Sequence, residues 1–116
     1  MDAAPAMIEE PPRPVVPVQA KFIYVFESLF KTVKGARRIL KWKDFLKAMA
    51  SVGFAHKPAT GGGAARVFWA AGTQWQTNVV LHEPHDGELG PAYQNEIAHL
   101  LNTAYGWEGR DFVVRA

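Results

Sequence analysis

The stretch Val79-Val80-Leu81-His82-Glu83-Pro84-His85 decides the fold, because it ends the strongest strand signal and leads into a turn at Asp86-Gly87. Shortly afterwards, Gly90-Pro91 opens the longest helix-like segment, and proline suits the first position of a helix. The core is therefore expected where this strand meets that helix. The same stretch contains His82 and His85, which are the first candidates for chemistry.

The composition indicates one ordinary globular domain. The chain has 116 residues, of which 48% are hydrophobic and 21% charged, enough for one modest core. The net charge of +2 is too small to indicate a partner, and the absence of cysteine excludes disulfides and thiolate metal sites. No apolar run approaches the roughly 20 residues that span a bilayer, and no signal peptide is recognisable. We therefore expect an intracellular protein, cytoplasmic or nuclear, with no membrane partner and no cofactor.

Residues 1–20 are expected to form a disordered, proline-rich tail ahead of a single domain at residues 21–116. Prolines at positions 5, 11, 12, 14 and 17 oppose helix formation, and few large apolar groups are available for burial. The spacing Pro11-x-x-Pro14 fits a polyproline II ligand of an SH3-type domain, although a solvated leader is the favoured interpretation.

Apolar spacing predicts the elements that follow. In order, they are helices near 22–33 and 42–52, strands at 54–58, 65–69 and 75–81, a helix from Pro91 to about 105, and a short edge strand at 112–114. The buried stripe of the last helix is predicted to be Tyr93, Ile97, Leu100, Leu101 and Ala104. Its polar residues are expected outside that stripe: Gln94, Asn95, His99 and Asn102.

This order predicts an α+β fold in which a helix, three antiparallel strands and a helix follow one another. Both helices should cover one face of the small sheet and leave the other face open, and the helix near 22–33 is an extra N-terminal element. Gly61-Gly62-Gly63 is interpreted as a hairpin turn, because it joins two strands and lacks the Gly-Lys-Ser/Thr of a phosphate loop.

His82 and His85 allow three interpretations. A metal site would need further ligands from Glu83, His56 or His99, but their spacing has no metal-site signature, so no metal is expected. Either histidine could serve as a general acid or base near neutral pH, although no serine or carboxylate partner is identifiable. Alternatively, both histidines anchor the turn through hydrogen bonds to the backbone.

Positive charge is concentrated in one segment that contains a single acid, Asp44. Its basic residues are Lys31, Lys34, Arg37, Arg38, Lys41, Lys43 and Lys47. Such a belt could contact the phosphates of a nucleic acid, and the alternative is a solvated helix face and loop. The candidate phosphate contacts are Lys34, Arg37, Arg38, Lys41, Lys43 and, from the second strand, Arg66.

Several blocks of sequence together resemble uncharacterised C-terminal domains of fungal proteins across residues 22–114. The blocks are Val25-Phe-Glu-Ser-Leu-Phe30, Trp42-Lys-Asp-Phe-Leu-Lys-Ala-Met49, Val52-Gly-Phe54, His82-Glu-Pro-His85 and Ala104-Tyr-Gly-Trp107. Those domains in turn resemble HicA-type mRNA interferase toxins, which share the helix, three strands, helix order and are similar in shape to the double-stranded-RNA-binding fold. In the toxins a Gly-Ser-His segment on the second strand supplies the catalytic histidine. A Val-Pro-x-His segment ends the third strand, and His85 would match its histidine.

The resemblance implies a toxin-like domain that has lost its catalytic residue. Aligning Phe68 with the aromatic residue of the toxins' second strand places Ala65 at the catalytic histidine, and the last helix lacks the arginines of the related fungal domains. We therefore favour a non-enzymatic, degenerate HicA-like module that binds RNA or another nucleic acid through its basic belt. One alternative is a ribonuclease that uses His85 or His82. The other is a protein-interaction module that uses the open sheet face or the proline-rich tail.

Overall fold

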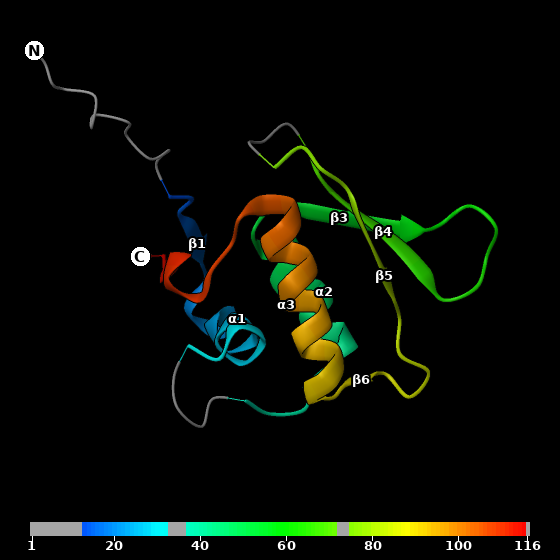
Figure 1. Cartoon of the computed structure of the whole chain (residues 1–116), viewed down its shortest axis with the longest axis horizontal. Helices are drawn as coiled ribbons and strands as arrows, with labels where there is room; N and C mark the ends of the chain where they lie inside the picture. Colours follow the sequence, from blue (N-terminus) through cyan, green and yellow to red (C-terminus); the bar gives the residue numbers. More distant parts are fainter. Residues whose placement is uncertain (1–12, 33–36, 72–74, 116) are drawn as a thin grey trace, which may run out of the picture.

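The computed structural model describes residues 13–32, 37–71 and 75–115, which form an α+β fold with three α-helices. The main sheet is antiparallel and contains β3 (Phe54–Pro58), β4 (Ala65–Ala70) and β5 (Val79–His82), in that spatial order. Helices α2 (Trp42–Ser51) and α3 (Pro91–Tyr105) lie together on one side of this sheet (Figure 1). The predicted α+β class with a three-stranded antiparallel sheet is therefore confirmed.

The helix ends follow local chemistry. Pro91 opens α3, and Gly106, with a φ of 74°, ends it in the left-handed conformation that glycine adopts easily. The first helix, α1 (Ile23–Phe30), is shorter than predicted, because Lys31 already turns left-handed with a φ of 53°. A 3₁₀ turn, η2 (Ala20–Phe22), precedes α1. Of the predicted continuation to Val33, residues 31 and 32 are described and are not helical, and Val33 lies outside the described residues.

The third strand of the sheet is also shorter than predicted, because it begins at Val79 and not at Trp75. Trp75 packs instead against the aromatic cluster, with its ring 5.2 Å from that of Trp107 at 90°. Within β5, Val79 and Leu81 are buried while Val80 and His82 are exposed, which is the period of two that a strand imposes.

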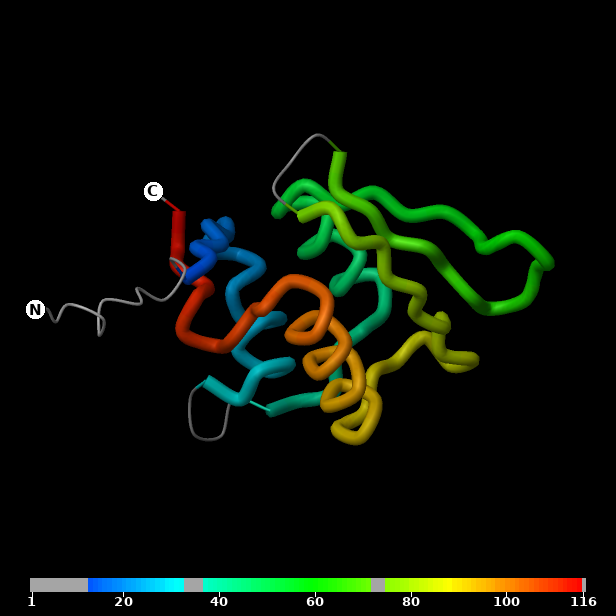
Figure 2. The backbone as a smooth tube through the Cα atoms, turned by 45° about the horizontal axis from the view of Figure 1, so that its top comes forward, coloured from blue at the N-terminus to red at the C-terminus, as the bar shows by residue number. Residues whose placement is uncertain are grey.

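The turn between β3 and β4 contains Gly61-Gly62-Gly63, as predicted. All three glycines have positive φ values between 79° and 104°, which other residues adopt only with strain. Ala59 N–H donates to Ala65 C=O at 2.9 Å and closes the ladder just before this turn. The resulting hairpin extends away from the helices (Figure 2).

The predicted tail is wrong for residues 13–20. Val16 and Val18 are 1% and 0% exposed and belong to β1 (Val16–Val18), which pairs in parallel with β7 (Phe112–Val114) near the C-terminus. Arg13 donates from Nη2 to Asp111 Oδ2 at 2.6 Å. We call β1, β7, Arg13 and Asp111 the terminal clasp, and Figure 1 shows β1 in blue beside the red C-terminal segment.

The proline-rich composition predicted a tail, because proline opposes most regular structure. Proline is nevertheless compatible with a short edge strand, which is what residues 16–18 form. Val18 C=O accepts from Arg115 N–H at 2.8 Å, so by alternation the backbone of Pro17 faces away from β7 and its missing N–H costs the pairing little. Residues 1–12, including Pro11 of the predicted SH3-type ligand, lie outside the described residues.

A small second strand pair connects α2 to the turn after β5. It is formed by β2 (Leu40–Lys41) and β6 (Glu88–Leu89), and Trp42 N–H donates to Gly87 C=O at 2.8 Å. A 3₁₀ turn, η3 (Gly109–Asp111), leads from α3 into β7. Neither the short pair nor the parallel pair is predicted from the sequence.

The core lies between the sheet and the helices and is rich in aromatic rings. Phe68 of β4 packs against Phe45 and Trp42 of α2, at centroid separations of 5.8 and 6.0 Å. A second group of rings surrounds Trp107, which is fully buried. These rings come from Phe26, Phe54, Trp75, Tyr105 and Phe112.

The predicted buried stripe of α3 needs two corrections. Leu100 is 40% exposed, whereas Gln94, expected outside the stripe, is fully buried. Gln94 is buried because its amide is satisfied, since Oε1 accepts from Ser28 Oγ at 2.7 Å and Nε2 donates to Leu89 C=O at 2.8 Å. Nε2 also donates to Arg38 C=O at 2.5 Å. Gln94 thus joins α1, α3 and the segment before β2.

Candidate nucleic-acid interface

Arg37, a predicted phosphate contact, is engaged in holding the fold together. Its guanidinium donates to Ser28 C=O at 2.9 Å, to Pro91 C=O at 2.8 Å and to Asn95 Oδ1 at 3.0 Å. These acceptors lie at the end of α1 and the start of α3. Because one planar fork serves both helices, Arg37 is not a free cation.

Arg38, the next residue, is exposed and lies against an aromatic ring. Its guanidinium carbon is 5.3 Å from the centroid of Tyr24. Burial, followed by the charge and hydrogen bonding of Asp44, raises the pKa of Tyr24, while Arg38 opposes this shift. Tyr24 therefore brings Arg38 next to the first turn of α2.

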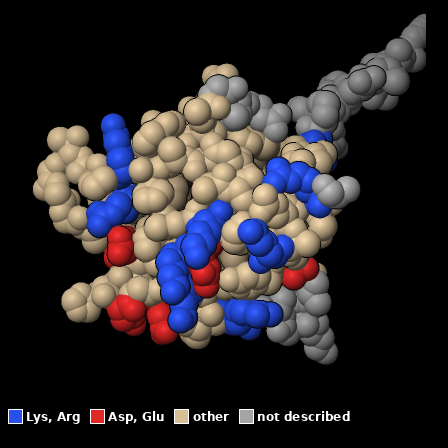
Figure 3. All heavy atoms as spheres, turned by 180° about the vertical axis from the view of Figure 1, so that it is seen from behind, with Lys and Arg blue, Asp and Glu red and all other residues tan. Residues whose placement is uncertain are grey.

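Lys43 and Lys47 lie on the solvent side of α2, one turn apart, and Lys41 precedes them at the N-cap. We call Arg38, Lys41, Lys43 and Lys47 the basic face. Since α3 lies in front of α2 in Figure 1, the reverse view in Figure 3 looks onto α2, and Lys and Arg side chains gather across that side. Lys34 lies outside the described residues.

The basic face lacks neutralising partners. None of its four cations forms an ion pair with an acid in the described part of the chain, where the paired cations are Arg13, Arg66 and Arg110. Glu88 stands opposite Lys41 in the β2–β6 pair, but no salt bridge joins them. The nearest acid on α2, Asp44, interacts with Tyr24. The face therefore presents four cations to solvent that no salt bridge to a described acid engages, with Asp44 as the acid on the same helix.

Arg66 lies apart from this face and is partly neutralised. Its Nη2 is 3.2 Å from Glu83 Oε1, and its Nη1 donates to Gly63 C=O at 2.9 Å and Ala65 C=O at 3.1 Å. These bonds hold the side chain over the end of the β3–β4 hairpin. Of the six predicted phosphate contacts, the structure leaves Arg38, Lys41 and Lys43 free and engages Arg37 and Arg66. Lys47, on the same α2 face, was not among those six.

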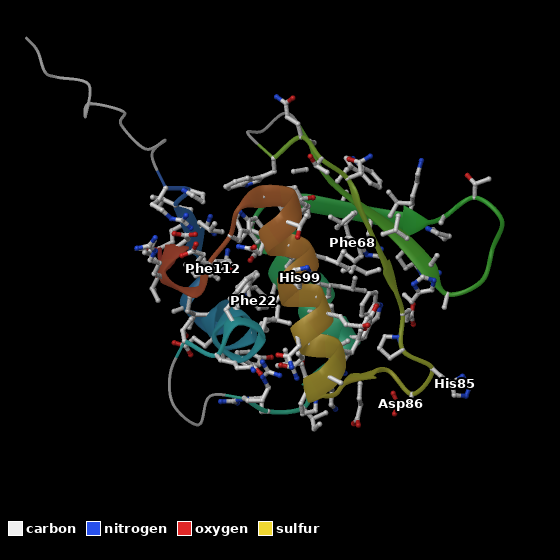
Figure 4. The ribbon with its side chains drawn as sticks, viewed as in Figure 1. Phe22, Phe68, His85, Asp86, His99 and Phe112 are labelled. Carbon is white, nitrogen blue, oxygen red and sulfur yellow. The ribbon has the colours of Figure 1, made fainter. Side chains whose placement is uncertain are left out.

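The histidines do not anchor the turn after β5 as the structural interpretation proposed. Both imidazoles are exposed and make no hydrogen bond to a described residue. The turn is held instead by Gly87 N–H to Pro84 C=O at 3.1 Å and by Glu88 N–H to Asp86 Oδ1 at 3.0 Å. Figure 4 shows His85 at the tip of this turn, far from His99 on α3.

A tyrosine hydroxyl occupies one position on the free edge of β5, at His82, and a second tyrosine hydroxyl bonds the segment just before that strand. Glu83 N–H donates to Ala64 C=O, so by alternation His82 turns its own N–H and C=O away from β4. Tyr93 Oη accepts from His82 N–H at 2.8 Å and donates to His82 C=O at 2.7 Å. Burial raises the pKa of Tyr93, and it raises the pKa of Tyr105, whose hydroxyl donates to Thr77 C=O, to about 12.

A hollow of about 430 Å³ lies between β5 and α3. It brings His82 near His99, Glu96 and Tyr93, a grouping that the sequence analysis did not predict because His99 was weighed only as a metal ligand. Among the described residues, no group of three or more His, Cys, Asp or Glu side chains is arranged to hold a metal ion. The hollow can supply two imidazoles and a carboxylate to an organic ligand.

The register of the sheet places His82 directly across from Ala65. Cross-strand neighbours on one face have Cβ atoms about 5 Å apart. His82 therefore lies on the same side of the sheet as the residue that aligns with the toxins' catalytic histidine. His85 lies beyond the strand, in the turn.

Comparisons with protein-family models, with curated proteins and with solved structures find no match to this chain. Within the described residues, no helix has both the length and the apolar character needed to cross a membrane.

Proposed function

We propose that this chain is a non-enzymatic, degenerate HicA-like module that binds RNA by holding the phosphate backbone on its basic face. The observation that carries the proposal is the group of four exposed cations without an ion-pair partner among the described acids: Arg38, Lys41, Lys43 and Lys47. Phosphate contacts of this kind release counterions and account for most sequence-independent affinity.

The position of these cations on α2 supports the same function. Lys41 and Lys43 stand at the N-terminal end of the helix, where the helix dipole is positive and cations are unfavourable by about 0.3–1 kcal/mol each. A bound phosphate would reverse this repulsion, because anions are favoured at that end. The arrangement therefore suits anion binding better than it suits stability.

A titration with labelled duplex and single-stranded RNA at several salt concentrations tests the proposal. Replacing all four residues of the basic face by glutamine should reduce the slope of log affinity against log salt by up to about 4. Arg110→Gln with Arg115→Gln, exposed cations near the C-terminus, is the matched control and should change the slope much less. Absence of binding by the unmodified chain at low salt would contradict RNA binding and favour a protein-interaction module.

A second candidate is a ribonuclease that uses His82. It is favoured by the register that sets His82 across from Ala65, and by the hollow that His82 shares with His99. A histidine pair can act as general base and general acid in phosphodiester cleavage. His85, the other predicted candidate, lines no part of this hollow.

Cleavage of a mixed RNA pool in the presence of a metal chelator separates the two candidates. The binding module should leave the RNA intact. Reproducible cutting that His82→Ala or His99→Ala abolishes, and that His85→Ala preserves, would establish the ribonuclease and refute the non-enzymatic proposal.

A further inference from the structure

The side of the sheet turned away from α2 has a partly exposed apolar surface, and its edge residues Val80 and His82 also border the hollow beside α3. In register, Trp69 pairs with Ala55, and Val67 pairs with both Lys57 and Val80. We call this surface the open face, and its residues are Ala55, Lys57, Ala65, Val67, Trp69, Val80 and His82. Val80 is 49% exposed, Val67 and Trp69 are partly exposed, and neither Val67 nor Trp69 packs against the core cluster. Folding alone therefore leaves an indole and two valines in contact with solvent.

The charge on the open face favours a negatively charged ligand. Lys57 and His82 contribute its ionisable groups, and none of its seven residues is acidic. Lys57 Nζ lies 5.6 Å from the centroid of the Trp69 ring. The flexible lysine stem allows this ammonium to move from the ring to a nearby phosphate. An aromatic ring beside a mobile cation is the pairing that stacks a base and neutralises its phosphate.

The open face is too small to be explained as a stable protein interface. Such interfaces use about 20–30 residues on each side, whereas this surface has seven, of which two are alanine. One nucleobase needs a single accessible aromatic ring, with apolar neighbours of low profile beside it. Trp69 is partly exposed and flanked by Ala55 and Val67, so it offers such a ring once the Lys57 ammonium moves aside.

We propose that the open face binds unpaired bases of single-stranded RNA, with one base stacked on Trp69 and Lys57 contacting the adjoining phosphate. This inference rests on the proposed RNA binding and names its substrate class: strands with unpaired bases, not continuous duplex. The basic face supplies affinity for the backbone, and the open face distinguishes single strands from duplex.

Two RNA probes of equal length test the inference, an oligoadenylate and an abasic strand with the same number of phosphates. The unmodified chain should bind oligoadenylate more tightly than the abasic strand. Trp69→Ala should weaken oligoadenylate binding by about tenfold, within the usual value of one base stacked on an aromatic ring. It should leave the affinity for the abasic strand and the salt slope unchanged. Trp69→Phe should retain most of the affinity, and Val114→Ala, at an exposed valine outside the open face, is the control.

The possible failures are distinguishable. Equal affinity of Trp69→Ala and the unmodified chain for oligoadenylate would overturn the stacking site but leave the basic face intact. Equal loss toward both probes would show that Trp69 acts through the fold, and would also overturn the site. If Trp69→Ala does not fold, Lys57→Gln is the variant to test. It should weaken the binding of both RNA probes by the equivalent of one phosphate contact. No effect of that change would refute the arrangement. Absence of any RNA binding would overturn both proposals together.

Discussion

In the terminal clasp, Arg13 meets the carboxylate of Asp111 at 2.6 Å and the carbonyl of Gly106 at 3.0 Å, whereas the lysines of the basic face meet no described acid. The clasp uses a cation to fasten one chain end to the other. Two cations of the basic face, Lys41 and Lys43, stand at the N-terminal end of α2, where they do least for stability. The difference shows that the partners of a charge, not its presence in a basic segment, separate the cations that hold the fold together from those left without an ion pair.

Removing the clasp should produce the largest effect. A chain lacking residues 1–20, compared with one lacking residues 1–12, should lose more than about 3 kcal/mol of unfolding free energy, because burying each valine side chain contributes about 1.5–3 kcal/mol. Val16 and Val18 are the two valines concerned. Urea denaturation followed by circular dichroism measures this difference. A loss below about 1 kcal/mol would mean that the clasp adds little to the fold.

Two adjacent arginines sharpen the comparison. Arg37→Gln removes hydrogen bonds to Ser28 C=O and Pro91 C=O and should lower the unfolding free energy by about 2 kcal/mol. Arg38→Gln should change it by less than about 0.5 kcal/mol but reduce the RNA salt slope by about 1. Thermal melts and titrations of both variants are the measurement. Similar behaviour of the two would contradict the separation of roles.

Acid should weaken the clasp at Asp111. Burial alone would raise the pKa of Asp111, but the Arg13 hydrogen bond and the Glu108 backbone N–H outweigh it and hold that pKa below its ordinary value of 3.8. Because the folded pKa is lowered, the stabilisation is complete above the ordinary value and is lost as pH falls through the folded value.

Asp111→Asn should therefore destabilise the fold by about 1 kcal/mol at neutral pH and flatten the acid limb of the stability curve. Glu96→Gln, at an exposed position of α3, is the control. Stability measured from neutral pH down to about pH 3 covers the window around the ordinary aspartate pKa. An unchanged acid limb in Asp111→Asn would show that other carboxylates control acid unfolding.

The smallest effect concerns the basic face itself. Lys43→Gln removes a cation from the first turn of α2 and should raise the unfolding free energy by about 0.3 kcal/mol. Lys47→Gln, one turn further along, should have a smaller effect. Averaged chemical melts at low salt can resolve this difference, and destabilisation by Lys43→Gln would show that the lysine supports the helix.

The sequence predicted the elements whose signal is local. The period of two in β5, the glycines of the β3–β4 turn and Pro91 at the start of α3 each follow from neighbouring residues. The terminal clasp does not, because Val16 finds its partner, Phe112, 96 positions away. The proline content predicted no strand at residues 16–18, because β1 is stabilised only by its pairing with the distant β7.

The sequence predicted which basic residues belong to the candidate site, but not which of them the fold engages in other contacts. Arg37 and Arg38 are identical in sequence terms, and only the approach of α3 makes Arg37 a structural residue. Gln94 was misplaced for the same reason, since its burial depends on Ser28 of a distant helix. The open face was predicted, but the position of Trp69 beside Lys57 depends on the register of the hairpin.

The hydroxyl of Tyr93 on the edge of β5 has a consequence for how the molecule behaves at high concentration. An exposed strand edge is a template on which another chain can add a strand, and many proteins prevent this with charged side chains or proline. Here a phenol occupies both backbone groups of His82, so polymerisation through that position is blocked by a neutral group. Salt does not screen such a block, and the raised pKa of Tyr93 keeps it intact into alkaline solution. High salt would therefore leave this protection against self-association at His82 in place.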